Sequence, residues 1–226
     1  MSIHNPKQAL YDQFALVAKA LGNPQRLELI EHLAQGPRGV DALATKLGLP
    51  IANVSQHLQA MRRAGLVLSE RDGKFINYRI ADESVLAAFA AIRAVAERHS
   101  AEVERVVRGW FDRHDEMEPI SRAELASRMA DGLVTVIDVR PADEFALGHV
   151  PGAINVPLSE LDNRLADLRT GREIVAYCRG PWCVMSFEAV AELRERGLNA
   201  RRLEGGMPEW QLAGLPVEHV HQGEKR

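Results

Sequence analysis

Two cysteines, Cys178 and Cys183, are the only thiols in the 226-residue sequence, and they stand five positions apart. A thiolate is a nucleophile, and two thiols this close in the chain can exchange between dithiol and disulfide. One such pair is not the framework of an extracellular disulfide-rich fold. In a reducing compartment the pair indicates chemistry, with Cys178 as the candidate nucleophile.

The cysteines lie in a loop between a strand-like run at 174–177 and a helical pattern that begins near Val184 or Met185. Such a loop can aim several backbone N–H groups at one sulfur, and the helix dipole adds to them. Both favour the thiolate over the thiol without a histidine base. After Cys178, the candidate active-site loop consists of Arg179, Gly180, Pro181, Trp182 and Cys183.

The second half of the chain alternates between strand-like and helix-like runs. The strand-like runs are residues 134–137, 153–156 and 174–177, and the helix-like runs are residues 122–129, 161–168 and 186–196. This alternation predicts an α/β domain with a mostly parallel sheet covered on both faces. Functional groups in such folds lie at the carboxyl ends of the strands, where Cys178 stands.

Residues 119–217 resemble a single rhodanese domain over nearly their whole length. The resemblance rests on the blocks VIDVRPADEF at 136–145, GHVPGAINVP at 148–157 and LEGGMPEW at 203–210. It implies that Cys178 takes the outer sulfur of a small donor, thiosulfate or a low-molecular-weight persulfide, and passes it to a thiol acceptor. Asp138, Arg140 and Glu144 are predicted to form a structural charged network, because unpaired buried charge is costly.

The sixth position of the loop departs from this resemblance. Sulfurtransferases of this type often carry Arg, Thr or Ser there, and this sequence has Cys183, which leaves Arg179 as the only cation in the loop. Cys183 and the next residue, Val184, also lack the arginine that closes a phosphatase loop. Two interpretations of Cys183 stay open: a thiol that attacks the Cys178 persulfide and leaves a disulfide, or a small residue packed under the loop.

The first half is helical in pattern and ends in a hairpin. Helices are predicted at 10–21, 24–34 and 50–64, with a short segment at 40–47 that ends at Gly48, and the runs 66–68 and 75–80 flank an Asp-Gly turn. Leu10, Phe14, Val17 and Leu21 give the first helix one apolar face. This order predicts a mainly α winged helix-turn-helix domain.

This half resembles the ArsR family of winged-helix repressors over residues 7–115. The resemblance rests on ALGNPQRL at 20–27, VSQHL at 54–58 and AGLV at 64–67. It implies a homodimer that places one recognition helix of each subunit in the major groove of double-stranded operator DNA.

The helix at 50–64 is the predicted recognition helix. With Val54, Leu58 and Met61 turned inward, its polar residues lie toward the opposite faces. The candidate DNA contacts on it are Asn53, Ser55, Gln56, His57, Gln59 and Arg62, and those on the wing are Arg71, Lys74, Tyr78 and Arg79. The alternative is a solvated polar face without a ligand.

A long helix is predicted from Asp82 onward. Its apolar positions alternate in steps of four and three, which is the 3.5-residue period of a helix packed on a partner helix: Val85, Phe89, Ile92, Ala96, His99, Val103, Val106 and Trp110. We interpret this seam as a dimer interface, with burial inside one subunit as the alternative.

No metal site and no cofactor are predicted. The segment 36–41 contains no cysteine, although soft-metal sensors of the ArsR family carry thiolate ligands there. The pairs His99 with Glu102 and Asp112 with His114 have the wrong order and separation for one interhelical zinc site. The cysteines of persulfide-sensing relatives are also absent from this half.

Composition agrees with two soluble domains. The formal net charge is −3, but residues 20–80 carry 8 basic against 5 acidic residues, which permits phosphate contact. The sequence has no apolar run of bilayer length and no signal-peptide pattern, so we expect a cytoplasmic protein. The charged, proline-ended stretch 112–119 sets the predicted domain boundary, with a DNA-binding and dimerisation domain over 1–117 and a rhodanese-like domain over 118–226.

Two functional hypotheses follow. In the first, the chain is a transcriptional regulator, acting as a repressor, whose operator affinity changes when Cys178 and Cys183 form a persulfide or disulfide. In the second, it is primarily a sulfurtransferase with an accessory DNA-binding domain. A third, an inactive rhodanese fold used for binding, is disfavoured by the intact Cys178. Whether the domain turns over as an enzyme stays open.

Overall fold

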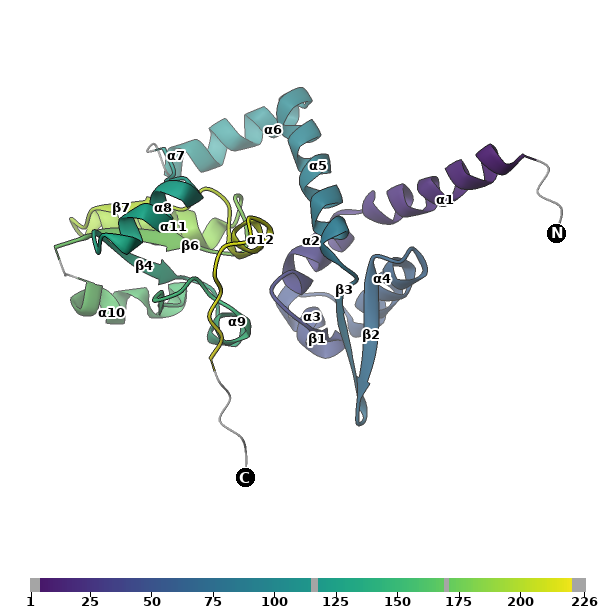
Figure 1. Ribbon diagram of the computed structural model, residues 1–226, viewed down its shortest axis with the longest axis horizontal. Helices are drawn as coiled ribbons and strands as arrows, with labels where there is room; N and C mark the ends of the chain where they lie inside the picture. Colours follow the sequence, from purple (N-terminus) through teal and green to yellow (C-terminus); the bar gives the residue numbers. More distant parts are fainter. Residues whose placement is uncertain (1–4, 115–117, 169–170, 221–226) are drawn as a thin grey trace. The chain divides into compact units, whose positions relative to one another are not determined.

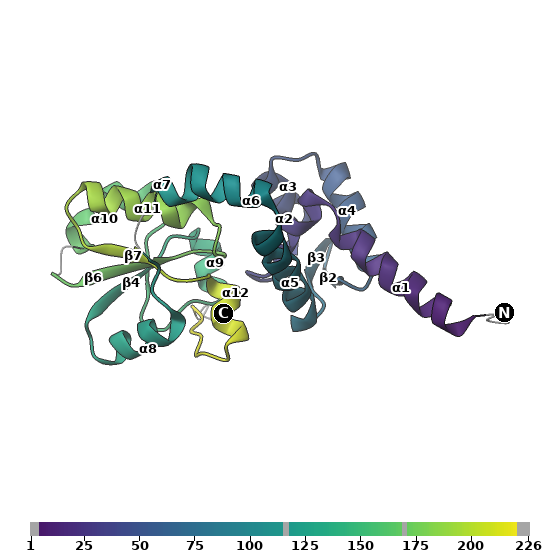
Figure 2. The same cartoon turned by 90° about the horizontal axis from the view of Figure 1, so that it is seen from above.

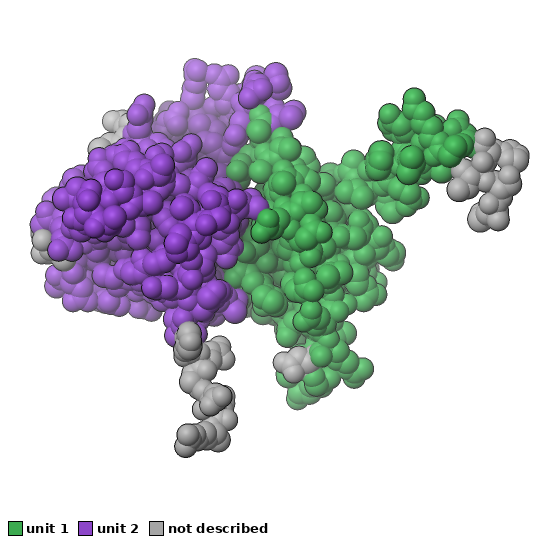
Figure 3. All heavy atoms as spheres, viewed as in Figure 1, with its two compact units in different colours: residues 1–94 green, residues 95–226 purple. Residues whose placement is uncertain are grey.

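A computed structural model describes residues 5–114, 118–168 and 171–220. The chain divides into two compact units, residues 1–94 and residues 95–226, which Figure 3 distinguishes by colour. We describe each unit separately. No helix in the described ranges is both long and apolar enough to cross a membrane.

The first unit contains the predicted helix-turn-helix. Its helices are α1 (Pro6–Leu21), α2 (Pro24–Leu33), α3 (Val40–Leu47) and α4 (Ile51–Arg63), followed by the start of α5 (Glu83–His99). Asn5 and Asn23 cap α1 and α2, because their side chains accept hydrogen bonds from Gln8 N and Arg26 N, both at 3.1 Å. The turn before α4 begins at Gly48, whose φ of 64° is the left-handed conformation that ends α3.

The wing is a three-stranded sheet. Strands β2 (Val67–Asp72) and β3 (Phe75–Ile80) form the predicted antiparallel hairpin, and β1 (Arg38–Gly39) adds to the other edge of β3. The sequence did not indicate β1, because two residues are too few to show a period.

The core of this unit lies under α4, the predicted recognition helix. Val54, Leu58 and Met61 of α4 are fully buried together with Leu29 and Ile30 of α2. The inward face predicted for α4 is therefore confirmed.

The prediction of one long helix beyond Asp82 was wrong. The helix α5 ends at His99, and Ser100 has an extended conformation (φ −102°, ψ 110°) that starts a new helix, α6 (Ala101–Val106). The hydroxyl of Ser100 accepts a hydrogen bond from Val103 N at 3.4 Å, as an N-cap does. Beyond α6 the chain forms a π-helix, η1 (Val107–Phe111), and a short helix α7 (Asp112–His114). The 3.5-residue seam is thus divided between separate helices.

The second unit contains the predicted parallel sheet. Its strands are β4 (Val134–Asp138), β5 (Ile154–Asn155), β6 (Glu173–Tyr177) and β7 (Ala200–Arg202), in the spatial order β5-β4-β6-β7, and all neighbours are parallel. The strand β7 is an addition to the prediction, since three residues that include two arginines show no apolar pattern.

Helices cover both faces of this sheet, as predicted. They are α8 (Arg122–Ala130), α9 (Ala142–Leu147), α10 (Leu161–Leu168), α11 (Val184–Glu195) and α12 (Met207–Leu212), with a 3₁₀ turn η2 (Leu158–Glu160) before α10. Figure 1 labels these helices, and Figure 2 shows α10 and α11 on one side of the sheet and α8 on the other. Alternate residues of β6 enter two separate cores: Ile174 and Ala176 pack in one, Val175 and Tyr177 in the other.

The compact units divide at residues 94 and 95, within α5, and residues 95–114 belong to the second unit. The boundary at 117 that we expected from the charged stretch stays a prediction about the separable domains.

Candidate functional site

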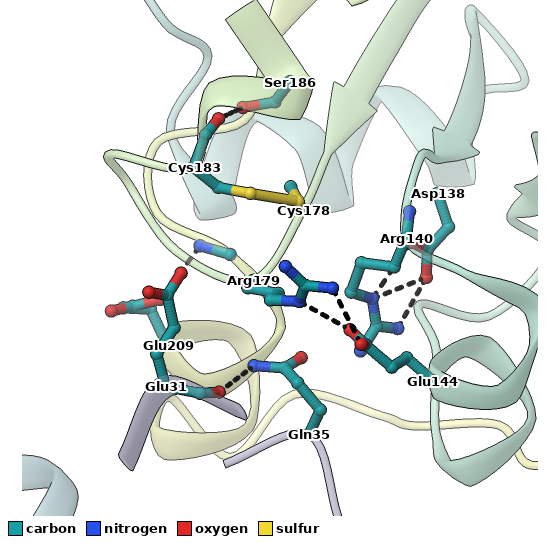
Figure 4. The surroundings of a disulfide bond; sticks show 11 residues. Glu31, Gln35, Asp138, Arg140, Glu144, Cys178, Arg179, Cys183, Ser186 and Glu209 are labelled. Carbon is teal, nitrogen blue, oxygen red and sulfur yellow. Dashed lines mark hydrogen bonds and ion pairs between the residues drawn. A yellow bond between two sulfur atoms is a disulfide. The ribbon is translucent and has the colours of Figure 1, made fainter. Parts of the chain in front are cut away.

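The cysteine loop joins the end of β6 to the start of α11. Cys178 directly follows Tyr177, at the carboxyl end of a central strand, and Cys183 is the residue before α11. A disulfide joins the two cysteines, whose Cα atoms are 6.2 Å apart (Figure 4). Cys178 is fully buried, and Cys183 is 7% exposed. The two sulfurs predicted to share one site are therefore brought into contact.

A second segment, the turn before α12, supports this loop. The carbonyl oxygen of Cys178 accepts a hydrogen bond from Met207 N at 3.0 Å. A Cβ atom placed on Gly206 would stand 2.5 Å from the same oxygen and closer still to the amide nitrogen of Gly180. Only a residue without a side chain allows the two backbones to approach in this way. Sequence reasoning missed the role of Gly206, although the Gly205-Gly206 pair before a helical run was a signal for it.

The predicted charged network consists of two ion pairs. Arg140 and Asp138 are both fully buried, and Arg140 Nε donates to Asp138 Oδ1 at 3.0 Å. Arg140 Nη2 also donates to the carbonyl oxygen of Gly148 at 2.8 Å. Burial by itself would lower the pKa of Arg140, but the hydrogen bond and charge of Asp138 outweigh burial and raise it, so the guanidinium stays charged.

Glu144 forms the second pair, with the loop itself. Its carboxylate is fully buried and accepts hydrogen bonds from Arg179 Nε at 2.8 Å and Arg179 Nη2 at 2.9 Å (Figure 4). The one cation of the six-residue loop is therefore neutralised by a carboxylate from α9. A donor with two negative charges gains little attraction from a cation that is already paired.

The remaining loop residues differ in exposure. Gly180 is buried and Pro181 is half-buried, whereas the side chain of Trp182 is 36% exposed. Burial raises the pKa of Tyr177, the residue before Cys178, and its hydroxyl oxygen accepts a hydrogen bond from Val150 N at 3.0 Å. Tyr177 therefore stays neutral and fixes the end of the strand.

The predicted recognition face of α4 is open to solvent. Asn53, Gln56, Gln59 and Arg62 are exposed, and Ser55 and His57 are half-buried. Burial, and then the positive charge of Arg26, lower the pKa of His57, so its imidazole is neutral at pH 7. This face presents amide, hydroxyl and guanidinium groups, which are the groups that contact base edges and phosphates.

The wing residues fall into three classes. Arg71 and Lys74 at the hairpin tip are exposed, and Arg79 forms an ion pair with Glu70 at 2.9 Å. Tyr78 is 7% exposed and packs in the core, in contrast to its prediction as a DNA contact. The strand period explains this difference, because Tyr78 lies on the face of β3 that is turned to the helices. We leave Tyr78 out of the proposed DNA-binding surface.

Metal ligands do not gather in the part of the chain that the structure describes: no three His, Cys, Asp or Glu residues there stand close enough together to hold one ion.

Family models match both units. The model of rhodanese-like domains matches residues 121–213, and the model of bacterial regulatory proteins of the arsR family matches residues 23–69. The chain belongs to the ArsR-type helix-turn-helix transcriptional regulators that carry a C-terminal rhodanese-like domain. The HTH-type transcriptional regulator Rv0324 of Mycobacterium tuberculosis is 47% identical over 212 residues, which are 94% of this chain and 93% of that protein.

Two further relatives match one half each. A sulfurtransferase of Allochromatium vinosum is 32% identical over 100 residues, covering 43% of this chain and 92% of that protein. A solution structure of a homodimeric winged helix-turn-helix domain from Mycobacterium bovis, Mb0332, is 42% identical and covers 45% of this chain and 94% of that one, with a TM-score of 0.41.

Proposed function

We propose that this regulator is a repressor that binds double-stranded operator DNA as a homodimer and responds to sulfane sulfur through Cys178 and Cys183. The observation that carries the proposal is the disulfide between these two residues. They are the only cysteines of the chain, and both lie in the loop where a rhodanese fold holds its nucleophile.

The chemistry proceeds in two exchanges. The Cys178 thiolate attacks the outer sulfur of a persulfide R–S–SH, which forms Cys178–S–SH and releases the thiolate RS⁻. The Cys183 thiolate then attacks Cys178 Sγ, which forms the Cys178–Cys183 disulfide and expels HS⁻. The two thiols are oxidised, the sulfane sulfur is reduced to sulfide, and two protons are released to solvent or to the leaving groups. No other oxidant is required.

The loop favours the thiolate that begins this sequence. The helix α11, of 12 residues, begins at Val184, directly after the loop, so the positive end of its dipole lies beside the loop. This positive end stabilises negative charge on a sulfur at the end of β6. The disulfide form, with Cys178 buried, is then the end state of the reaction, in which no Cys178 thiolate remains to attack another donor.

The preferred donor is a low-molecular-weight persulfide. Thiosulfate is a dianion, and the loop cation that would receive it, Arg179, already donates two hydrogen bonds to Glu144. A persulfide carries at most one negative charge at its outer sulfur, so the backbone N–H groups suffice to bind it.

The homodimer is supported by the apolar surface of the first unit. Leu10, Tyr11 and Phe14 of α1 are between 56% and 61% exposed. The neighbouring groove between α1, α2 and α5 has a volume of about 730 Å³, and its lining includes Val17, Leu21, Leu27, Ala88 and Ile92. An exposed apolar helix face that continues into an apolar groove is suited to a second copy of the same unit.

The test compares operator affinity in three states of the loop. Full-length protein is prepared as dithiol, as persulfide in the Cys183→Ser variant, and as disulfide after treatment with a small persulfide. Each is titrated with a duplex selected from a random pool by the dithiol and disulfide forms in parallel. We expect a 5- to 150-fold difference in Kd, the range of about 1–3 kcal/mol typical of coupled sites.

Mass spectrometry of the same samples identifies the chemistry. Wild-type protein should lose two hydrogens after the persulfide treatment, and Cys183→Ser should gain one sulfur on Cys178. Equal Kd values in all three states would refute the sensor and favour a sulfurtransferase with an accessory DNA-binding domain. A Cys178→Ser variant that still responds would place the sensor elsewhere.

A further inference from the structure

Four aromatic side chains connect the cysteine loop to the π-helix η1. We call them the aromatic cluster: Trp110 and Phe111 of η1, Trp182 of the loop, and Phe187 of α11. The ring centroids of Phe111 and Trp182 are 5.0 Å apart, and those of Phe111 and Phe187 are 4.8 Å apart. The ring centroids of Trp110 and Phe187 are 6.0 Å apart, in an edge-to-face arrangement. Residues 71 positions apart in the chain are thus in direct contact within the second unit.

One member of the cluster is fixed and another is exposed. Phe187 is 1% exposed, and the guanidinium of Arg202 in β7 lies 3.5 Å from its ring centroid. Trp182 is 36% exposed and directly precedes Cys183. Phe187 is therefore the anchor, and Trp182 is the ring whose position depends on the conformation of the loop.

The π-helical geometry of η1 allows two adjacent residues to contact the same ring. Successive residues of a regular α-helix point about 100° apart, and the wider π turn brings neighbours closer to one face. Trp110 and Phe111, which are adjacent, both contact Phe187. Single π turns are rare and occur frequently at functional sites.

A polar contact adds a second, independent connection. The indole Nε1 of Trp182 donates a hydrogen bond to Glu97 Oε1 at 2.5 Å. Glu97 lies in the last turns of α5, the helix that also contributes Val85 to the core of the winged-helix unit. Trp182 therefore contacts both η1 and the end of the helix that leads out of the DNA-binding unit.

We infer that Trp182 transmits the state of the Cys178–Cys183 pair to residues 97–111, through Phe111 and Glu97. The inference rests on the proposed function and names the route of its regulation. The disulfide closes a ring of six residues and removes backbone freedom from the segment that carries Trp182. In the disulfide form Trp182 is held against Phe111 and Glu97. In the dithiol form the loop regains that freedom, the contacts open, and α6 and η1 become less ordered.

Hydrogen exchange measures this change directly. Full-length protein, as dithiol and as disulfide, is compared by mass spectrometry of peptides that cover residues 97–111. We expect exchange in this segment to be several-fold slower in the disulfide form. In Phe111→Leu, which loses the ring but stays apolar and keeps the Trp182–Glu97 hydrogen bond, the difference should decrease although the disulfide still forms.

The control is Val106→Ala, which changes a 51% exposed side chain one turn earlier and should keep the wild-type difference. Trp110→Leu is the second variant if Phe111→Leu does not fold. Equal exchange of residues 97–111 in the two wild-type forms would overturn the inference, as would a Phe111→Leu protein with an unchanged difference.

Operator affinity separates this inference from the proposed function. If Kd differs between dithiol and disulfide but exchange in 97–111 does not, the sensor stands and the route through Trp182 is wrong. If exchange differs and Kd does not, the loop moves the segment but the proposed regulation of DNA binding fails.

Discussion

Arg179 donates hydrogen bonds from Nε and Nη2 to the two carboxylate oxygens of Glu144, at 2.8 and 2.9 Å, across 35 positions of the chain. This two-point pair holds Arg179, the residue after Cys178, against the helix α9. The loop cation is thus part of the support of the loop, and in the proposed function the backbone N–H groups bind the sulfur donor.

Loss of the Glu144 carboxylate should destabilise the rhodanese-like unit. Glu144→Ala leaves the guanidinium of Arg179, only 16% exposed, without its carboxylate partner, which we expect to cost about 3 kcal/mol of unfolding free energy. Urea denaturation measures the change. The control is Asp167→Ala, which removes the exposed pair with Arg164 and should cost below about 1 kcal/mol. Equal losses in the two variants would contradict a buried supporting pair.

A methyl group at Gly206 should displace the cysteine loop. Gly206→Ala places a Cβ 2.5 Å from Cys178 O, so one backbone must move, at a cost of about 1–3 kcal/mol. Persulfide formation on Cys178 should also slow, as followed by mass spectrometry over time. Gly180→Ala is the matched control, because its Cβ would meet no atom within 4 Å. A Gly206→Ala protein as stable as Gly180→Ala would contradict the close backbone contact between Gly206 and the cysteine loop.

Stability should fall in mild acid because of His57. Burial, together with the charge of Arg26, holds the pKa of His57 below its usual 6.5 in the folded state. The unfolded chain therefore takes up a proton first as pH decreases, and the stabilisation present above about pH 6.5 is lost between that pH and the folded pKa. An NMR titration should find the depressed pKa in wild type and a higher one in Arg26→Ala. His57→Gln should remove this part of the pH dependence, and an imidazole that titrates at 6.5 or above would contradict the assignment.

A charge on the apolar face of α1 should dissociate the proposed dimer. Phe14 is 61% exposed, and Phe14→Glu would bury a carboxylate in the interface, which we expect to weaken association by at least about a hundredfold. Light scattering coupled to gel filtration gives the mass. Leu133→Glu, at a 58% exposed position of the second unit, should leave the mass unchanged. A dimeric Phe14→Glu protein would place the interface elsewhere.

The spacing of apolar residues predicted most helices and strands, but it did not predict where a helix is interrupted. The alternation around residues 134–137 and 174–177 predicted a parallel sheet, and the inward face of α4 was predicted from Val54, Leu58 and Met61. The same approach extended one helix through Ser100, because a heptad period records side-chain spacing and does not register a capping hydroxyl.

The sequence predicted which loop forms the candidate site, but it did not predict the contacts that other segments make with this loop. The positions of Cys178 and Cys183 between a strand and a helix were apparent from the sequence. The contacts of Gly206 with the loop and of Phe111 with Trp182 join segments that are remote in the chain, and no local pattern encodes them. Tyr78 shows the opposite case, since a polar-tipped residue on a wing was interpreted as a DNA contact and is part of the core.

In the proposed function, the short separation of the two cysteines also determines how the response depends on protein concentration and on time. A thiol held five positions from the persulfide reacts at a rate that is independent of protein concentration, with an effective concentration far above the millimolar thiols that would compete for the same sulfur. Each protomer can therefore convert one donor molecule into one closed loop without meeting another protein. After a short exposure of cells to persulfide, the fraction of protein in the disulfide form would persist until a reductant reduces it. The rate of that reduction would set the duration of the response.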